Sequence, residues 1–167
     1  MSSSFPPAET QDLPEGYRRV AEVLQQLGHP HAPQFLDVPA RTAQEAAEVL
    51  GLAVGQIAKS VVFRRKSDDL AVLVVTSGDK RVDERKVAAL AGPIGRADAE
   101  FVKSRTGFTI GGVSPVAHLT PPVMLIDREL FRFDEVWAAA GHPKGVFKVA
   151  PQALVQLTGA PVADVTA

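Results

Sequence analysis

The 167-residue sequence contains no cysteine, which excludes disulfide bonds, thiolate metal ligands and a cysteine nucleophile. Aromatic residues are also scarce, at 6% of the chain, so base stacking is not expected to dominate a contact with RNA. No apolar run approaches the roughly 20 residues of a membrane-spanning helix. These absences favour a globular protein that has no thiol chemistry and no membrane partner.

The sequence also lacks a large excess of positive or negative charge, because the formal net charge is −1. That balance does not indicate a general binder of polyanions, and no DNA partner is expected, although a local basic patch can still bind RNA. Residues 1–13 are rich in serine and proline and have no secretory signal pattern. We expect a flexible tail over 1–13, a single domain over 14–167, and a cytoplasmic location.

Periodicity and capping signals predict an ordered series of elements. Helices are expected to end at Gly28 and to cover 42–50, 84–91, 98–103 and 151–158, with strands at 35–38, 59–64, 70–76, 123–127, 135–140 and 146–149. Several strands follow one another without a helix between them. This order favours a mixed or antiparallel sheet with helices packed outside it.

Lys59 stands at the start of an apolar run that includes Val61 and Val62. Two interpretations are open. A lysine on an edge strand discourages pairing between sheets. An ammonium beside a pocket can instead hydrogen-bond a carbonyl or a ribose hydroxyl, or bind a phosphate.

The loop Gly111–Pro115 is the second candidate site. Tandem glycines have no Cβ, so their backbone can approach a ligand closely, and loop N–H groups suit a carbonyl oxygen or an oxyanion. A tight structural turn is the alternative. The pattern matches neither a dinucleotide-binding loop nor a P-loop. Ser114 lies outside a G-x-S-x-G elbow, so a serine nucleophile is not favoured.

Histidines offer a general base but no metal site. His118 follows the glycine loop and could act as a base, or could merely hydrogen-bond the backbone. His142 reads as a turn residue that could border the pocket. His29 and His31 lack metal-ligand spacing and have no carboxylate cluster beside them, so we expect no metal and no cofactor.

Basic residues gather around the predicted hairpin and the helix that follows it. They form either a solvated face interleaved with acidic residues or a footprint for an RNA phosphate backbone. The residues of this basic set are Arg64, Arg65, Lys66, Lys80, Arg81, Arg85 and Lys86.

Four segments occur together in an order that is typical of one family: Gln56–Phe63, Gly78–Asp83 ahead of a helix, Thr106–Pro115 and Ala140–Phe147. On these segments the chain resembles YbaK/EbsC-type proteins, free-standing relatives of the editing insertion domain of bacterial prolyl-tRNA synthetases. The resemblance covers residues 17–160. It implies an α/β (α+β) fold with a mixed, largely antiparallel, barrel-like sheet surrounded by helices. It also implies hydrolysis of the ester between a small wrong amino acid and tRNA, usually tRNA(Pro).

The resemblance also implies roles for individual residues. Lys59 matches the essential lysine of the family, and the substrate loop is Gly111, Gly112, Val113, Ser114 and Pro115. Asp79 and Asp83 lie in the middle motif and are expected at the substrate, as is His142. His118 departs from the cysteine-specific members, which argues against cysteine as the amino acid removed.

An aminoacyl ester is already activated, so the implied reaction needs no covalent nucleophile. Loop N–H groups would stabilise the oxyanion, Lys59 would anchor the ester or a phosphate, and His118 or a substrate group would activate the water. The expected partners are mischarged tRNA and an aminoacyl-tRNA synthetase. The competing hypotheses are a non-catalytic tRNA-binding or synthetase-associated adaptor on the same fold, and a hydrolase of small esters or amides.

Overall fold

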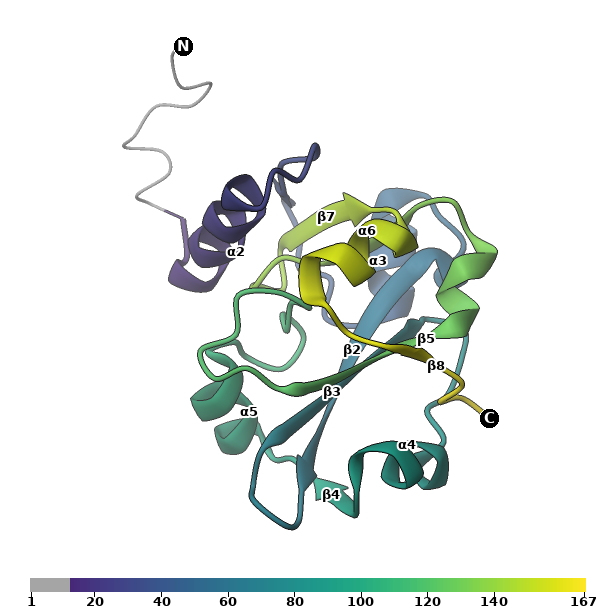
Figure 1. Cartoon of the computed structure of the whole chain (residues 1–167). Coiled ribbons are helices and arrows are strands. Elements are labelled where there is room, and N and C mark those ends of the chain that lie inside the picture. Colours follow the sequence, from purple (N-terminus) through teal and green to yellow (C-terminus); the bar gives the residue numbers. More distant parts are fainter. Residues whose placement is uncertain (1–12) are drawn as a thin grey trace.

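A sheet of eight strands occupies the centre of residues 13–167, the part of the chain that the computed structural model describes. The strands are β1 (Gln34–Phe35), β2 (Ile57–Arg65), β3 (Ala71–Ser77), β4 (Ile94–Arg96), β5 (Val123–Asp127), β6 (Val136–Ala139), β7 (Gly145–Val149) and β8 (Val162–Ala163). Their order is β1-β7-β6-β2-β3-β5-β8, and β4 pairs with β2 off this path (Figure 1).

The sheet is mixed, as the sequence predicted. Strand pairs β1–β7, β2–β3, β2–β4 and β6–β7 are antiparallel, whereas β2–β6, β3–β5 and β5–β8 are parallel. The longest pairing is the predicted hairpin of β2 and β3. Residues of β3 are buried at every position because its two faces enter different cores. Leu73 and Val75 join the main core, while Val72 and Val74 pack with Val87.

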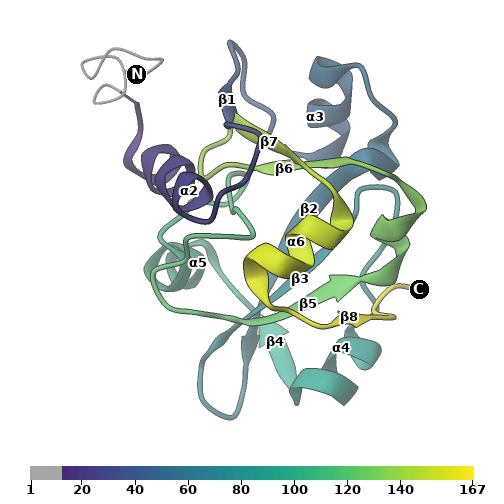
Figure 2. The same ribbon diagram turned by 45° about the horizontal axis from the view of Figure 1, so that its top comes forward.

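Five helices surround the sheet in the described residues: α2 (Glu15–Gln26), α3 (Ala43–Leu50), α4 (Glu84–Ala91), α5 (Ala99–Thr106) and α6 (Pro151–Thr158). Short 3-10 turns η1 (Val54–Gln56) and η2 (Arg128–Arg132) precede β2 and follow β5. Helices α2 and α4 lie at opposite ends of the molecule, and α6 lies between them beside the sheet (Figures 1 and 2). None of the helices in residues 13–167 is long and apolar enough to cross a membrane.

Local sequence signals explain where the helices begin and end. Thr42 and Glu45 form the predicted capping box of α3, in which each side chain accepts the other residue's backbone N–H. Asp98 caps α5, but the helix continues to Thr106 rather than ending at 103, because the first left-handed residue is Gly107, at φ 84°.

One predicted strand needs correction, and two short strands were missed. The strand predicted at 35–38 is only Gln34–Phe35, because the N–H of Leu36 still bonds to Lys144 but the chain then bends toward Pro39. Strands β4 and β8 were not predicted; they have three and two residues, too few to show a period. Residues 1–12 of the predicted tail lie outside the described part.

Candidate functional site

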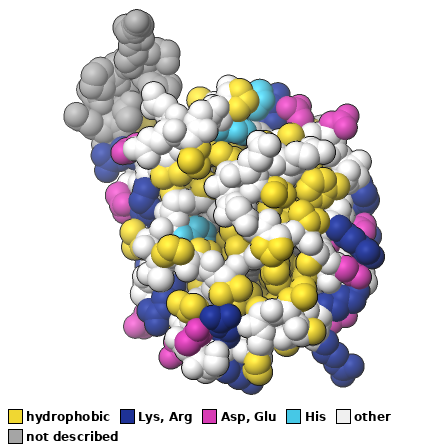
Figure 3. Space-filling model, viewed as in Figure 1, with side chains coloured by type: hydrophobic (Ala, Val, Ile, Leu, Met, Phe, Trp, Pro, Cys, Tyr) yellow, Lys and Arg dark blue, Asp and Glu magenta, His cyan; other side chains and the backbone are white. Residues whose placement is uncertain are grey.

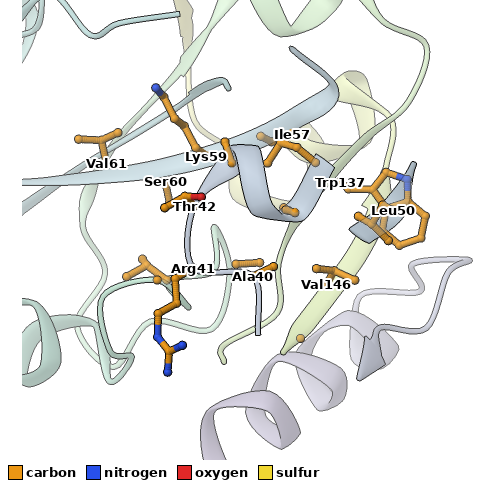
Figure 4. Close-up of a pocket in the computed structure, with 18 of the residues that line it drawn as sticks. Ala40, Arg41, Thr42, Leu50, Ile57, Lys59, Ser60, Val61, Trp137 and Val146 are labelled. Atoms are coloured by element: carbon orange, nitrogen blue, oxygen red, sulfur yellow. The ribbon is translucent and has the colours of Figure 1, made fainter. Parts of the chain in front are cut away.

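A cavity of about 370 Å³ opens beside β2 (Figure 4). Its walls come from β2, from α3 and the segment Ala40–Thr42 before it, from β6 and β7, and from the glycine loop. Most of the lining is apolar, with small side chains such as Ala46, Ala58 and Ala138. Lys59 and Arg41 are the two basic residues in the lining.

The cavity lies where β2 has no neighbour on one side. Strand β6 pairs with β2 only at Ile57 and Ala58, and β4 pairs with it only at Phe63–Arg65. Between them the edge of residues 59–62 is unpaired in the described structure. The sheet therefore leaves a gap in which a ligand can reach the backbone of β2.

The register of the hairpin decides which backbone groups face this gap. The N–H of Arg65 donates to the carbonyl of Leu70 at 2.8 Å, so odd-numbered residues of β2 direct their hydrogen bonds to β3. The N–H and C=O groups of Ser60 and Val62 consequently point toward the open edge. Ser60 also lines the cavity.

Lys59 brings a cation to this cavity. It lies on β2 opposite Thr76 of β3 and is half-buried. Its Nζ makes no hydrogen bond or ion pair within residues 13–167. Burial lowers the pKa of Lys59, and the negative charge of Asp79 acts in the opposite direction. An ammonium that has lost hydration without gaining a partner is available for a ligand oxygen.

The glycine loop reaches the same cavity because its glycines allow two close approaches. Gly111 adopts φ 94°, and a Cβ there would lie 3.1 Å from the side chain of Arg41. A Cβ on Gly112 would lie 2.8 Å from backbone atoms of His142. Gly111 and Val113 line the cavity together with Lys59. Gly112 is not part of the lining and packs against the backbone of His142 instead.

Ser114 and Pro115 are buried and are not among the residues that line the cavity. The Ser114 hydroxyl accepts a hydrogen bond from the N–H of Val116. A buried hydroxyl facing its own loop has no access to a substrate carbonyl. This placement agrees with the argument from the sequence against a serine nucleophile.

His118 also lies outside the cavity lining. Its Nε2 is 2.6 Å from the carbonyl oxygen of Ser114, and its ring packs edge-on against Phe108 with 5.4 Å between centroids. Burial lowers the pKa of His118, so the ring is neutral at pH 7 and Nε2–H donates to the carbonyl. These contacts favour the loop-fixing alternative, and a catalytic role for His118 stays a prediction.

The two aspartates of the middle motif are engaged with other groups. Asp79 accepts two hydrogen bonds from Arg132, at 2.8 and 3.2 Å, and these hydrogen bonds are the main cause of its lowered pKa. Asp83 caps α4 by accepting the N–H groups of Arg85 and Lys86. Neither aspartate lines the cavity. Asp79 affects the site only through its negative charge, which raises the pKa of Lys59.

His142 lies against the back of the glycine loop, next to Gly112. Its Nδ1 accepts the backbone N–H of Lys144 at 3.0 Å. Burial lowers the pKa of His142, and the positive charges of Lys144 and Arg41 lower it further. It thus borders the site, as the sequence suggested, but holds the turn rather than lining the cavity.

The basic set of the hairpin and α4 lies away from the cavity, since none of its seven members lines it. Four of them pair with acidic side chains: Arg64 with Asp69, Arg65 with Asp68, Lys80 with Glu129 and Lys86 with Asp164. On the face in Figure 3, basic and acidic side chains alternate around the rim while apolar ones fill the centre. A tRNA footprint on this set remains a prediction.

Sequence reasoning missed several residues of the site. Arg41, Ile110 and Trp137 line the cavity, and Arg132 holds Asp79. Ile110 lies inside the segment Thr106–Pro115 but was not singled out, and no motif marks Arg41, Trp137 or Arg132, because their positions depend on contacts between distant segments. Within residues 13–167 no group of three or more histidine or acidic side chains is arranged to hold a metal ion.

Comparison with known proteins identifies the family of this chain. Residues 37–157 match the family model described as the aminoacyl-tRNA editing domain. The chain belongs to this family. It is 32% identical over 118 residues to the uncharacterized protein YwhH of Bacillus subtilis, covering 70% of this chain and 74% of YwhH. Over 127 residues it is 25% identical to the proposed Cys-tRNA(Pro)/Cys-tRNA(Cys) deacylase EbsC of Enterococcus faecalis, covering 75% of this chain and 77% of EbsC.

Two further comparisons place this editing domain in context. The proline–tRNA ligase of Lactobacillus acidophilus is 32% identical over 109 residues, which cover 64% of this chain but 19% of the ligase. A crystal structure of a proposed trans-editing enzyme for prolyl tRNA synthetase superposes with a TM-score of 0.86 at 42% identity, covering 93% of this chain and 99% of the other. The fold and the family predicted from the sequence are thereby confirmed.

Proposed function

We propose that this editing domain is a deacylase that hydrolyses the ester between tRNA and a small wrong amino acid, with mischarged tRNA(Pro) as its substrate. The observation that carries the proposal is the cavity that brings Lys59 together with Gly111 and Val113 at an unpaired edge of β2. A prolyl-tRNA synthetase is the partner that this function implies, because it supplies the charged tRNA. Such a reaction takes place in the cytoplasm.

The glycine loop supplies donors for the developing oxyanion. The N–H of Gly112 donates to the carbonyl of Thr109 at 3.0 Å and is therefore occupied. The N–H groups of Gly111 and Val113 make no hydrogen bond within residues 13–167, and both residues line the cavity. One well-placed oxyanion donor contributes about 3 kcal/mol to transition-state stabilisation.

Lys59 then has the role of an electrostatic anchor. Its ammonium hydrogen-bonds the ester or the neighbouring ribose hydroxyl and so places the carbonyl carbon near the loop donors. A water molecule attacks this carbon and loses a proton, and the carbonyl oxygen becomes the oxyanion. Collapse then breaks the bond to the ribose oxygen of tRNA, which takes up the proton that the water lost. No covalent intermediate with the protein is required.

The shape of the cavity favours a small acyl group. Alanines at 40, 46, 58 and 138 leave room for the acyl group, and the larger side chains of Leu50, Ile57 and Trp137 set its boundary. A pocket that admits only small side chains hydrolyses errors that a synthetase pocket of similar shape cannot reject by binding alone.

The deciding experiment measures deacylation of tRNA(Pro) charged with alanine, serine, threonine, cysteine or proline. We expect at least one small non-proline ester to be hydrolysed much faster than prolyl-tRNA(Pro). If none is hydrolysed while charged tRNA still binds, the non-catalytic adaptor is the correct function. Release of amino acids from small-molecule esters alone would point to the third hypothesis, an esterase unrelated to tRNA.

A further inference from the structure

Two cations near the cavity have no acidic partner in the described residues: Arg41, which is part of the lining, and Lys144, which precedes the lining residue Gly145. Arg41 is exposed and lines the cavity with its aliphatic stem, and Lys144 is half-buried. Within residues 13–167 neither side chain forms an ion pair, although many other basic residues do, including the four of the hairpin and α4 described above. A charge that the protein leaves unpaired beside a cavity is available for a ligand of opposite sign.

Backbone contacts hold the two cations beside the glycine loop. The N–H of Ala40 donates to the carbonyl of Pro143 at 2.7 Å, which joins the segment before Arg41 to the segment before Lys144. The stem of Arg41 packs against Gly111, where a Cβ would lie 3.1 Å away. Both cations are close enough to His142 to lower the pKa of its ring.

The surroundings do not cancel this charge. Asp37 and Glu45 each lie four residues from Arg41, and neither forms an ion pair with it in the described structure. The Oε1 of Glu45 accepts the backbone N–H groups of Arg41 and Thr42. Its carboxylate is thus used by the cap of α3. Beside the cations, Ile110 is 58% exposed, an apolar surface on which a nucleobase could rest.

We infer that Arg41 and Lys144 form a binding site for a phosphate group of the RNA 3′ end, at the mouth of the cavity. The inference rests on the proposed function, because an ester held in the cavity brings the phosphate of its own nucleotide to the mouth. Figure 4 shows Arg41 and Lys59 on different sides of the cavity, so Lys59 remains free for the ester. An RNA phosphodiester fits the planar guanidinium of an arginine with a lysine beside it.

The test compares two substrates that differ in the phosphate. One is alanyl-tRNA(Pro), and the other is 3′-O-alanyl-adenosine, which has the ester but no phosphate. We expect the double variant Arg41→Gln/Lys144→Gln to raise KM for the charged tRNA about tenfold and to change KM for the nucleoside ester less than about twofold. Equal losses on both substrates, or no loss on either, would overturn the phosphate site.

A matched control removes two charges elsewhere. Arg96 and Lys103 are also exposed, lie outside the basic set, and have no ion pair in the described structure. The variant Arg96→Gln/Lys103→Gln should leave both KM values within about twofold of wild type, whereas a tenfold rise would mean that net charge, not a local site, controls binding. Circular dichroism checks that each variant is folded. The variant Arg41→Lys keeps the charge but loses the bidentate guanidinium, so its KM for the charged tRNA should lie between those of wild type and Arg41→Gln.

A binding measurement separates this inference from the proposed function. If wild-type protein hydrolyses neither ester, the deacylase proposal fails, but fluorescence anisotropy with an uncharged RNA hairpin ending in CCA still tests the site. A loss of about tenfold in affinity for Arg41→Gln/Lys144→Gln, with a flatter salt dependence, would support the phosphate site. Unchanged affinity would overturn it.

Discussion

Replacing Lys59 by methionine should remove activity while leaving the protein at least as stable as wild type. Methionine keeps an unbranched apolar stem and removes only the ammonium. That ammonium has lost hydration and makes no ion pair or hydrogen bond in the described residues, so no favourable contact is lost. Asp79 attracts it at longer range, but Asp79 is already paired with Arg132.

The expected magnitudes follow from this environment. Because Lys59 is only half-buried, solvent screens much of the charge. We expect the free energy of unfolding to rise by between zero and about 1 kcal/mol, and Tm by up to about 4 °C. Loss of the anchor should lower kcat/KM at least about 100-fold, the scale of one electrostatic contact in a transition state.

The pH dependence has a definite sign. The folded pKa of Lys59 is below its unfolded value, so between the two the unfolded chain binds more protons and wild-type stability rises with pH. The advantage of Lys59→Met should therefore shrink as the pH approaches about 10.4, the ordinary lysine pKa.

Thermal unfolding and single-turnover deacylation measure the two effects on the same protein. Lys66→Met, at an exposed lysine beyond the end of β2, is the control and should change stability by less than about 0.5 kcal/mol. Near-normal turnover of Lys59→Met would remove Lys59 from the mechanism. Loss of turnover together with a stability loss above about 1 kcal/mol would make its role structural.

Three further outcomes are expected. Gly112→Ala should cost about 1–3 kcal/mol of stability and lower turnover, because its Cβ would lie 2.8 Å from backbone atoms. Gly95→Ala is the control and should be tolerated, because its Cβ would meet only a flexible lysine side chain at 3.3 Å. Equal effects of the two substitutions in unfolding and kinetic assays would refute the argument about the loop. His118→Ala should cost about 1–3 kcal/mol of stability with unchanged selectivity. Below about pH 6.5 the wild type should lose more stability than the variant, because the folded pKa of His118 is lowered. Slower turnover at full stability would restore its catalytic role. Asp79→Asn should cost less than about 1 kcal/mol of stability at pH 7. The difference from wild type should vanish as the pH falls below about 4 and through the lowered pKa of Asp79, because the carboxylate then loses its charge. If the denaturant unfolding curves of variant and wild type coincide at both pH values, the ion pair with Arg132 does not contribute to stability.

Local features of the sequence determined most of the secondary structure and named the main parts of the site. The capping pair Thr42 and Glu45 fixes the start of α3, and the β-branched runs form the hairpin of β2 and β3. Tandem glycines predicted a loop with close backbone approaches. These features were predictable because each depends on a few neighbouring residues, whose propensities act without help from the rest of the chain.

Tertiary structure alone decided which residues share the cavity. The gap in the sheet exists because β6 and β4 pair with different ends of β2, and such pairings have no local signal. Packing placed Gly111 and Val113 in the same cavity lining as Lys59 but kept the buried Ser114 out of it. Acidic partners neutralised much of the basic set, whereas Arg41 and Lys144, far apart in the sequence, both lie near His142 and have no acidic partner within residues 13–167. Side-chain exposure and charge pairing depend on long-range contacts, which the order of residues does not display.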